Sequence, residues 1–143
     1  MKFDLDCVRD ILIALEDTIV PNDSGAIPTN YSAKALKCHP RVAKYPPNQV
    51  MYTLRIMNDG GLVSFNFQPM GTSDLQFNPS LTSGITYAGH QYLASVRDDV
   101  IWKKTARKLM EIGGTASMTL VTAISEGIAN SLMKGLTSPP SPP

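Results

Sequence analysis

Residues 47–86 constrain the fold of this chain most strongly, because a helical pattern leads directly into an alternating one. Pro46 and Pro47 precede a helical stretch with Val50, Leu54 and Met57 facing inward. The stretch ends at Asp59-Gly60-Gly61, where a glycine can adopt the left-handed conformation. Leu62 to Gln68 then alternates apolar and polar residues, as in a half-buried strand, and a loop and a returning strand follow up to Thr86. This order is typical of a winged helix-turn-helix.

Helices are expected on both sides of this segment. Apolar residues recur every three or four positions from Leu5 to Ile19, which predicts an amphipathic helix with Asp4 as its N-cap. Between this helix and Pro46, we expect a short strand at residues 31–36 and one helical turn at residues 39–45. Later periodic stretches predict helices from Tyr87 through Val96, over residues 100–112 with Asp98-Asp99 as a cap, and over residues 115–136.

We therefore predict an α+β protein, a winged helix-turn-helix with a C-terminal helical extension. The winged-helix domain covers residues 1–86, and the extension that packs on it covers residues 87–136. A chain of 143 residues with 43% hydrophobic residues can bury a core of this size. Residues 137–143 hold four prolines among the last five positions, so this tail is expected to be disordered.

Targeting features are not found in the sequence. Charged residues interrupt the first 20 positions, and no apolar stretch approaches the roughly 18 residues that a membrane span needs. The two cysteines, Cys7 and Cys38, suit a reducing compartment better than a disulfide scaffold. We therefore expect a cytoplasmic protein with no membrane partner.

The net charge of +1 conceals blocks of opposite sign. Residues 1–23 carry six acids and two bases, whereas residues 24–58 carry five bases and no acid. A local attraction to nucleic acid is thus compatible with a nearly neutral chain. From Ile56 to Val96 there is no Lys or Arg, so the expected wing has no cation for a phosphate.

The helix that begins near Pro47 is the candidate DNA-recognition helix. Asn, Gln and Arg side chains can read base edges through paired hydrogen bonds, and nearby cations can neutralise phosphates. The alternative is the solvated polar face of a helix that only packs. The candidate base-reading residues, expected to point outward or sideways, are Asn48, Gln49, Tyr52, Thr53 and Arg55, and the candidate phosphate contacts are Lys34, Lys37, Arg41 and Lys44.

Other chemistry has less support. The strong metal-ligand candidates, Cys7, Cys38, His39 and His90, are not in a zinc-site spacing, so no metal or cofactor is expected. No phosphate-binding glycine loop or hydrolase motif is present, which favours a non-enzymatic protein. A second basic run is more typical of the solvated face of an amphipathic helix than of a nucleic-acid surface; it comprises Lys103, Lys104, Arg107 and Lys108.

Several segments resemble the uncharacterised bacterial and phage family DUF2513. The resemblance covers roughly residues 1–112 and is carried by residues 1–12, 49–63, 85–93, 96–99 and 102–103. Gln49 and Thr53 stand where the family usually has an acid and a histidine, and residues 21–47 align poorly. The resemblance implies a winged-helix fold and an origin in a phage, a prophage or a bacterial host. It implies no function, because the family has none established.

Two functional hypotheses follow. The first is a DNA-binding accessory or regulatory factor of phage or prophage type, with duplex DNA as its partner. The second is a protein-interaction module, for instance a phage factor that binds and modulates a host or defence protein. This module would use the neutral wing around Phe67 to Phe77 and the last helix, where Met118, Met133, Gly127 and Gly135 suit an adaptable interface or a homodimer.

Overall fold

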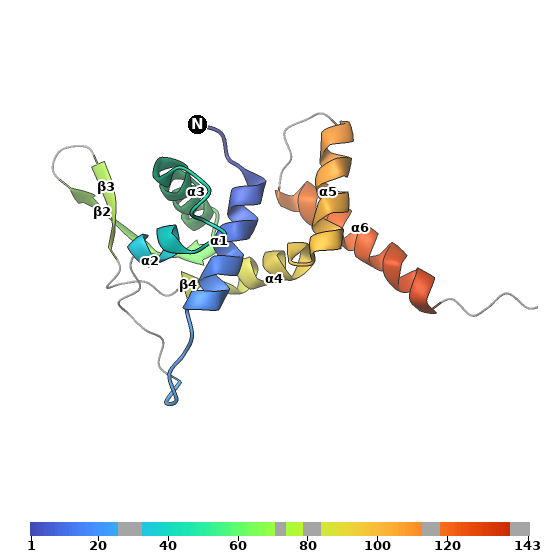
Figure 1. Cartoon of the computed structure of the whole chain (residues 1–143), viewed down its shortest axis with the longest axis horizontal. Coiled ribbons are helices and arrows are strands. Elements are labelled where there is room, and N and C mark those ends of the chain that lie inside the picture. Colours follow the sequence, from blue (N-terminus) through green and yellow to red (C-terminus); the bar gives the residue numbers. More distant parts are fainter. Residues whose placement is uncertain (26–32, 71–73, 79–83, 113–117, 138–143) are drawn as a thin grey trace, which may run out of the picture. The chain divides into compact units, whose positions relative to one another are not determined.

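The computed structural model describes residues 1–25, 33–70, 74–78, 84–112 and 118–137, and it divides into two compact units. The first unit is Met1–Leu93 and the second is Ala94–Pro143. The described chain is mostly helical with short antiparallel strands, so it is an α+β protein (Figure 1). Within the described ranges, no helix combines the length and the apolar character needed to cross a membrane.

The first helix forms as the sequence predicts. Helix α1 is Leu5–Thr18, and the Asp4 Oδ1 accepts hydrogen bonds from the backbone N–H of Asp6 at 2.9 Å and of Cys7 at 3.3 Å. These bonds satisfy two of the N–H groups that a helix start leaves without partners, which confirms Asp4 as the N-cap.

The segment between Ala33 and Cys38 differs from the prediction. Helix α2 is Ala33–Cys38, so the expected strand at residues 31–36 is wrong where the structure describes it. Alanine, leucine and lysine are among the strongest helix formers, and they dominate this segment. The chain then makes hydrogen-bonded turns, in which the His39 carbonyl accepts from Val42 N–H at 2.9 Å and from Ala43 N–H at 2.8 Å.

Helix α3 is Pro47–Asp59 and follows these turns. Its inward residues Val50, Leu54 and Met57 are buried, as predicted. The helix ends at the expected glycines, and Gly61 takes the left-handed conformation with φ of 79°.

Two small antiparallel sheets follow α3. The predicted strand over residues 62–68 is divided into β1 (Val63–Ser64) and β2 (Asn66–Met70), and the returning chain forms β3 (Asp74–Asn78) and β4 (Gly84–Ile85). Strand β1 pairs with β4, and β2 pairs with β3 with Phe67 opposite Phe77.

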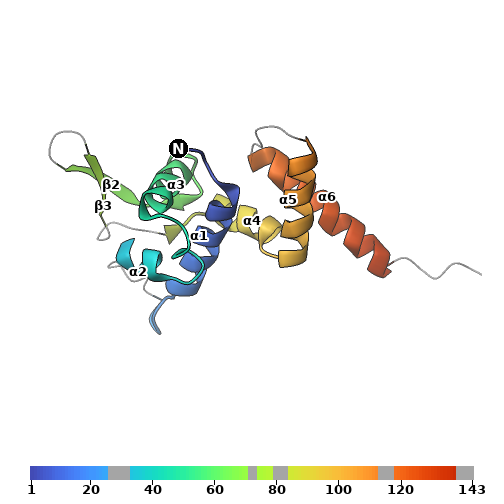
Figure 2. The ribbon, with the colours of Figure 1, turned by 45° about the horizontal axis from the view of Figure 1, so that its top comes forward.

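The break between β1 and β2 falls at Phe65, which is buried and whose N–H donates to Asn58 Oδ1 at 2.8 Å. In Figures 1 and 2, the β2–β3 ribbon extends beyond the helices of this unit. The sequence predicts the loop of this hairpin at residues 69–74. Strand β2 extends to Met70 and β3 begins at Asp74, so the loop is shorter than predicted, and residues 71–73 lie outside the described part of the chain.

Helix α4 (Tyr87–Val96) approaches the backbone after α3 closely. The carbonyl of Leu62 accepts from Thr86 N–H at 3.1 Å, and the Thr86 hydroxyl accepts from Gly89 N–H at 3.0 Å. A Cβ atom at Gly89 would overlap the Leu62 carbonyl oxygen. Only glycine therefore allows this approach.

The second unit is built mainly on α5 (Asp99–Ile112) and α6 (Met118–Thr137), which pack against each other (Figure 2). Asp98 Oδ1 accepts from Ile101 N–H at 2.9 Å, so Asp98 caps α5 as predicted. Between the helices, the hydroxyls of Thr105 and Ser125 lie 3.1 Å apart and both residues are fully buried. The division between the units lies within α4, whereas the predicted boundary lies just before it, after residue 86. The proline-rich tail that we predict to be disordered lies outside the described residues, apart from Thr137 at the end of α6.

Candidate nucleic-acid interface

Helix α3 presents one polar stripe to solvent. Asn48, Tyr52 and Arg55 are spaced four and three residues apart, so they share the side opposite Val50, Leu54 and Met57. Asn48 and Arg55 are exposed and Tyr52 is half-buried. None of the three side chains makes a hydrogen bond or an ion pair with another described residue. Their donors and acceptors are therefore available to a ligand.

The other two candidates on α3 turn toward the protein. Thr53 is fully buried, so its expected outward or sideways position is wrong. It lies three residues after Val50 and four before Met57, which places it within the inward stripe. The Gln49 side-chain amide donates to the Lys2 carbonyl at 3.1 Å and to the Thr53 hydroxyl at 3.2 Å. Gln49 and Thr53 thus hold α3 against the N-terminal segment.

Cys7 lies next to Thr53, on the buried side of α1. Burial raises the pKa of the Cys7 thiol to about 11, and a hydrogen bond with Thr53 partly offsets this rise. The thiol is therefore protonated at neutral pH and acts as a small apolar group. The other cysteine, Cys38, is exposed.

Two of the four residues predicted to contact phosphates form ion pairs with an aspartate of the same unit. Asp10 on α1 is only 4% exposed, and its carboxylate lies 3.3 Å from Arg41 Nη1 and 2.9 Å from Lys44 Nζ. The Arg41 and Lys44 side chains remain 40% and 59% exposed. Together the three groups carry a net charge of +1, so this part of the basic block is weaker than its sequence suggests.

Tyr45 completes this cluster. Its hydroxyl donates to Asp10 Oδ2 at 2.7 Å, and the Lys44 ammonium lies 5.3 Å from the centre of its ring. Burial, assisted by the bond to Asp10, holds the pKa of Tyr45 well above its ordinary value. The phenol therefore stays protonated and remains a donor to Asp10.

The remaining candidates lie on or beside α2. Lys37 is half-buried and makes no ion pair with a described residue, while the side chain of Lys34 lies outside the described part of the structure. His39 Nε2 is 3.3 Å from Asp17 Oδ2, and its Nδ1 accepts from Arg41 N–H at 3.2 Å. In the described ranges, no three residues among His, Cys, Asp and Glu come together as a metal site would require.

Sequence reasoning did not identify two features. Asp10 has a recognisable signal, because Cys7, Asp10 and Ala14 follow one another at helical spacing on the buried side of α1. The second feature is an apolar groove between α5 and α6, lined in part by Lys104 and Lys108. The small residues Gly127 and Ser131, one turn apart, are its sequence signal.

These observations define an α+β protein whose first unit combines packed helices, two small antiparallel sheets and an outward-facing polar stripe on α3. The chain belongs to the family described as Hypothetical protein (DUF2513), which it matches over residues 2–116. This match confirms the family resemblance of the sequence. Neither a curated protein nor a solved structure matches the chain.

Proposed function

We propose that the first unit is a winged helix-turn-helix that binds duplex DNA through α3. Helices α2 and α3, with the turns between them, form the helix-turn-helix of this proposal. Strands β2 and β3 form the wing, because they follow α3 directly and pair as a hairpin. The protein would act as a DNA-binding accessory or regulatory factor of phage or prophage type.

The outward stripe on α3 is the observation that carries this proposal. Asparagine and arginine can each make paired hydrogen bonds to base edges in the major groove. Asn48 and Arg55 lie about two turns apart on one face, and Tyr52 lies between them with a hydroxyl that can contact a base or a phosphate. A helix of this kind can enter the major groove with all three side chains toward the bases.

Cations beside α3 would position the duplex. Arg41 and Lys44 precede α3 and keep part of their charged side chains in water while they contact Asp10. Lys37 adds a cation on α2. Because Asp10 cancels one of these charges, the phosphate attraction is modest, and base contacts from α3 must supply much of the binding.

Alanine variants on α3 test the proposal. Fluorescence anisotropy with labelled duplex DNA at low salt should show binding by the wild-type protein. Asn48→Ala, Tyr52→Ala and Arg55→Ala should each weaken binding to a preferred sequence by about 1–3 kcal/mol, or roughly 5- to 150-fold. Arg107→Ala is the matched control, because it removes the same charge as Arg55→Ala but from the second unit. Undetectable binding by the wild-type protein would contradict the proposal.

A further inference from the structure

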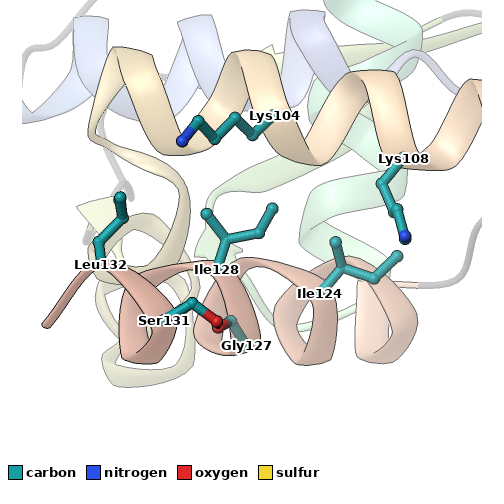
Figure 3. A pocket seen from close by; sticks show the side chains of 7 residues that line it. All are labelled: Lys104, Lys108, Ile124, Gly127, Ile128, Ser131 and Leu132. Carbon is teal, nitrogen blue, oxygen red and sulfur yellow. The ribbon is translucent and has the colours of Figure 1, made fainter. Parts of the chain in front are cut away.

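The groove between α5 and α6 has an apolar floor and a basic rim. Its volume is about 400 Å³, within the range of ligand pockets. Ile124, Ile128 and Leu132 of α6 form the floor at intervals of one helical turn. Figure 3 shows Lys104 and Lys108 of α5 extending beside these side chains, with Lys108 near Ile124.

Two of the residues that line this groove, Gly127 and Ser131, are small. The two helices approach each other through Thr105 and Ser125, whose short side chains hydrogen-bond at 3.1 Å. Gly127, which lines the groove, has no side chain, and a Cβ atom there would meet nothing within 4 Å. The floor residues Ile124 and Ile128 are half-buried.

The two charged residues that line the groove, Lys104 and Lys108, are both basic. Lys104 and Lys108 are exposed, and so are Lys103 and Arg107 on the same helix. None of the four makes an ion pair with a described residue. An apolar floor next to unpaired ammonium groups favours a ligand with apolar side chains flanked by carboxylates.

We propose that this groove binds an acidic amphipathic helix of another protein. The floor extends about 12 Å from Ile124 to Leu132, so two to three turns of a helix can lie along it. Apolar residues at positions i, i+4 and i+7 of the bound helix would contact the isoleucines and Leu132. Glutamate or aspartate beside this stripe would pair with Lys104 and Lys108. This site lies in the second unit and is independent of the proposed DNA binding by α3.

The charges disfavour two other occupants. In a two-fold dimer through this groove, the same surface of each copy meets, so the lysines of both copies would approach one another. Duplex DNA could pair its phosphates with the lysines, but it has no apolar surface to cover the isoleucines. An acidic helix is matched to both parts of the groove.

Synthetic helical peptides test this proposal on the full-length protein. The first peptide, of about 18 residues, carries leucines at i, i+4 and i+7 flanked by glutamates, and the second replaces every glutamate with lysine. Anisotropy should show binding of the glutamate peptide at least tenfold tighter than that of the lysine peptide. Equal binding of the two peptides, or no binding of the glutamate peptide, would overturn the proposal.

Charge-reversal variants locate the site. Lys104→Glu with Lys108→Glu should weaken binding of the glutamate peptide at least tenfold and strengthen binding of the lysine peptide. Lys103→Glu with Arg107→Glu reverses the same charge on α5 away from the groove and should change either affinity less than threefold at physiological salt. Equal losses of glutamate-peptide affinity in the two double variants would indicate a general basic surface and contradict a specific site in the groove. The proposal would also be contradicted if the wild-type protein bound neither peptide and Lys104→Glu with Lys108→Glu instead abolished binding to duplex DNA. If the protein forms a dimer through this groove and the glutamate peptide does not dissociate it, the proposal is also contradicted.

Discussion

The hydroxyl of Tyr45 donates a 2.7 Å hydrogen bond to the carboxylate of Asp10 and thereby joins the middle of α1 to the chain just before α3. Asp10 also contacts Arg41 and Lys44, so one buried acid organises three residues from a single stretch. Burying an ionised carboxylate costs much free energy unless it is paired and hydrogen-bonded, as Asp10 is. The start of α3 is therefore positioned by Asp10 as well as by apolar packing.

Removing this carboxylate should destabilise the first unit. Asp10→Ala should lower the free energy of unfolding by about 2–4 kcal/mol, because it leaves a small cavity and removes three polar contacts. Tyr45→Phe should cost about 1 kcal/mol, since Arg41 and Lys44 still neutralise Asp10. Urea denaturation measures both losses. Asp23→Ala, at an exposed position, is the control and should change stability by less than about 0.5 kcal/mol. A similarly small effect of Asp10→Ala would contradict the organising role of Asp10.

The buried thiol of Cys7 should make stability depend on alkaline pH. Its pKa is about 11 in the folded protein and near 9.0 ordinarily, so below pH 9 the thiol is protonated in both states and its contribution is complete. Between pH 9 and 11 the unfolded chain loses this proton first, and stability falls.

The Cys7→Ala variant isolates this contribution. It should be less stable than the wild type near pH 8, and the difference should shrink by about 2 kcal/mol near pH 10.5. Tyr92, whose pKa burial also raises, titrates in both proteins and so cancels in the comparison. The pKa of Tyr45 is raised first by burial and by its bond to Asp10, both of which Cys7→Ala retains, and only in smaller part by the charge of Cys7. A difference in unfolding free energy that stays constant with pH would show that the Cys7 pKa is not raised.

The helices are predicted well from the sequence where an apolar stripe and a capping residue occur together. Asp4 and Asp98 cap helices as expected, and the glycines after α3 end it. The strand predicted at residues 31–36 is wrong where the structure describes it, because a six-residue segment is too short for periodicity to separate a helix from a strand. The division of the strand at Phe65 depends on a side-chain bond from Asn58, which no local pattern reveals.

The candidate site was predicted less completely, for two physical reasons. Asn48, Tyr52 and Arg55 follow from helical spacing alone, but a polar residue such as Thr53 can occupy the inward stripe when a partner is buried with it. The pairing of Arg41 and Lys44 with Asp10 joins residues more than thirty positions apart. Charge counted along the sequence cannot show such cancellation.

Gly89 should be the most sensitive of the described glycines. Gly89→Ala should destabilise the first unit by about 3 kcal/mol or more, because the new methyl group would overlap the Leu62 carbonyl. Gly135→Ala on α6 is the matched control, since a Cβ there meets nothing and helix propensity improves by up to about 1 kcal/mol. Thermal denaturation distinguishes them. If Gly89→Ala is as stable as the wild type, α4 does not approach the backbone as closely as described.

The hydroxyl pair in the second unit should show strong coupling. Thr105→Val should cost about 1–2 kcal/mol, because it leaves the buried Ser125 hydroxyl without the partner that it has now. Ser125→Ala should cost less, because the Thr105 hydroxyl keeps its 2.7 Å hydrogen bond to the Ile101 carbonyl. The double variant should cost less than the sum of the two, and a double-mutant cycle by denaturation gives the coupling energy. Strictly additive losses would contradict direct contact between the two hydroxyls.

The salt dependence of duplex binding tests the central claim, that the outward stripe of α3 binds DNA, most directly. Affinities of wild type, Arg55→Ala and Arg107→Ala would be measured by anisotropy from about 50 to 200 mM salt. We predict duplex binding that weakens with salt, a loss of at least about fivefold for Arg55→Ala, and wild-type affinity within about twofold for Arg107→Ala. Equal affinities for wild type and Arg55→Ala across the whole salt range would contradict the claim.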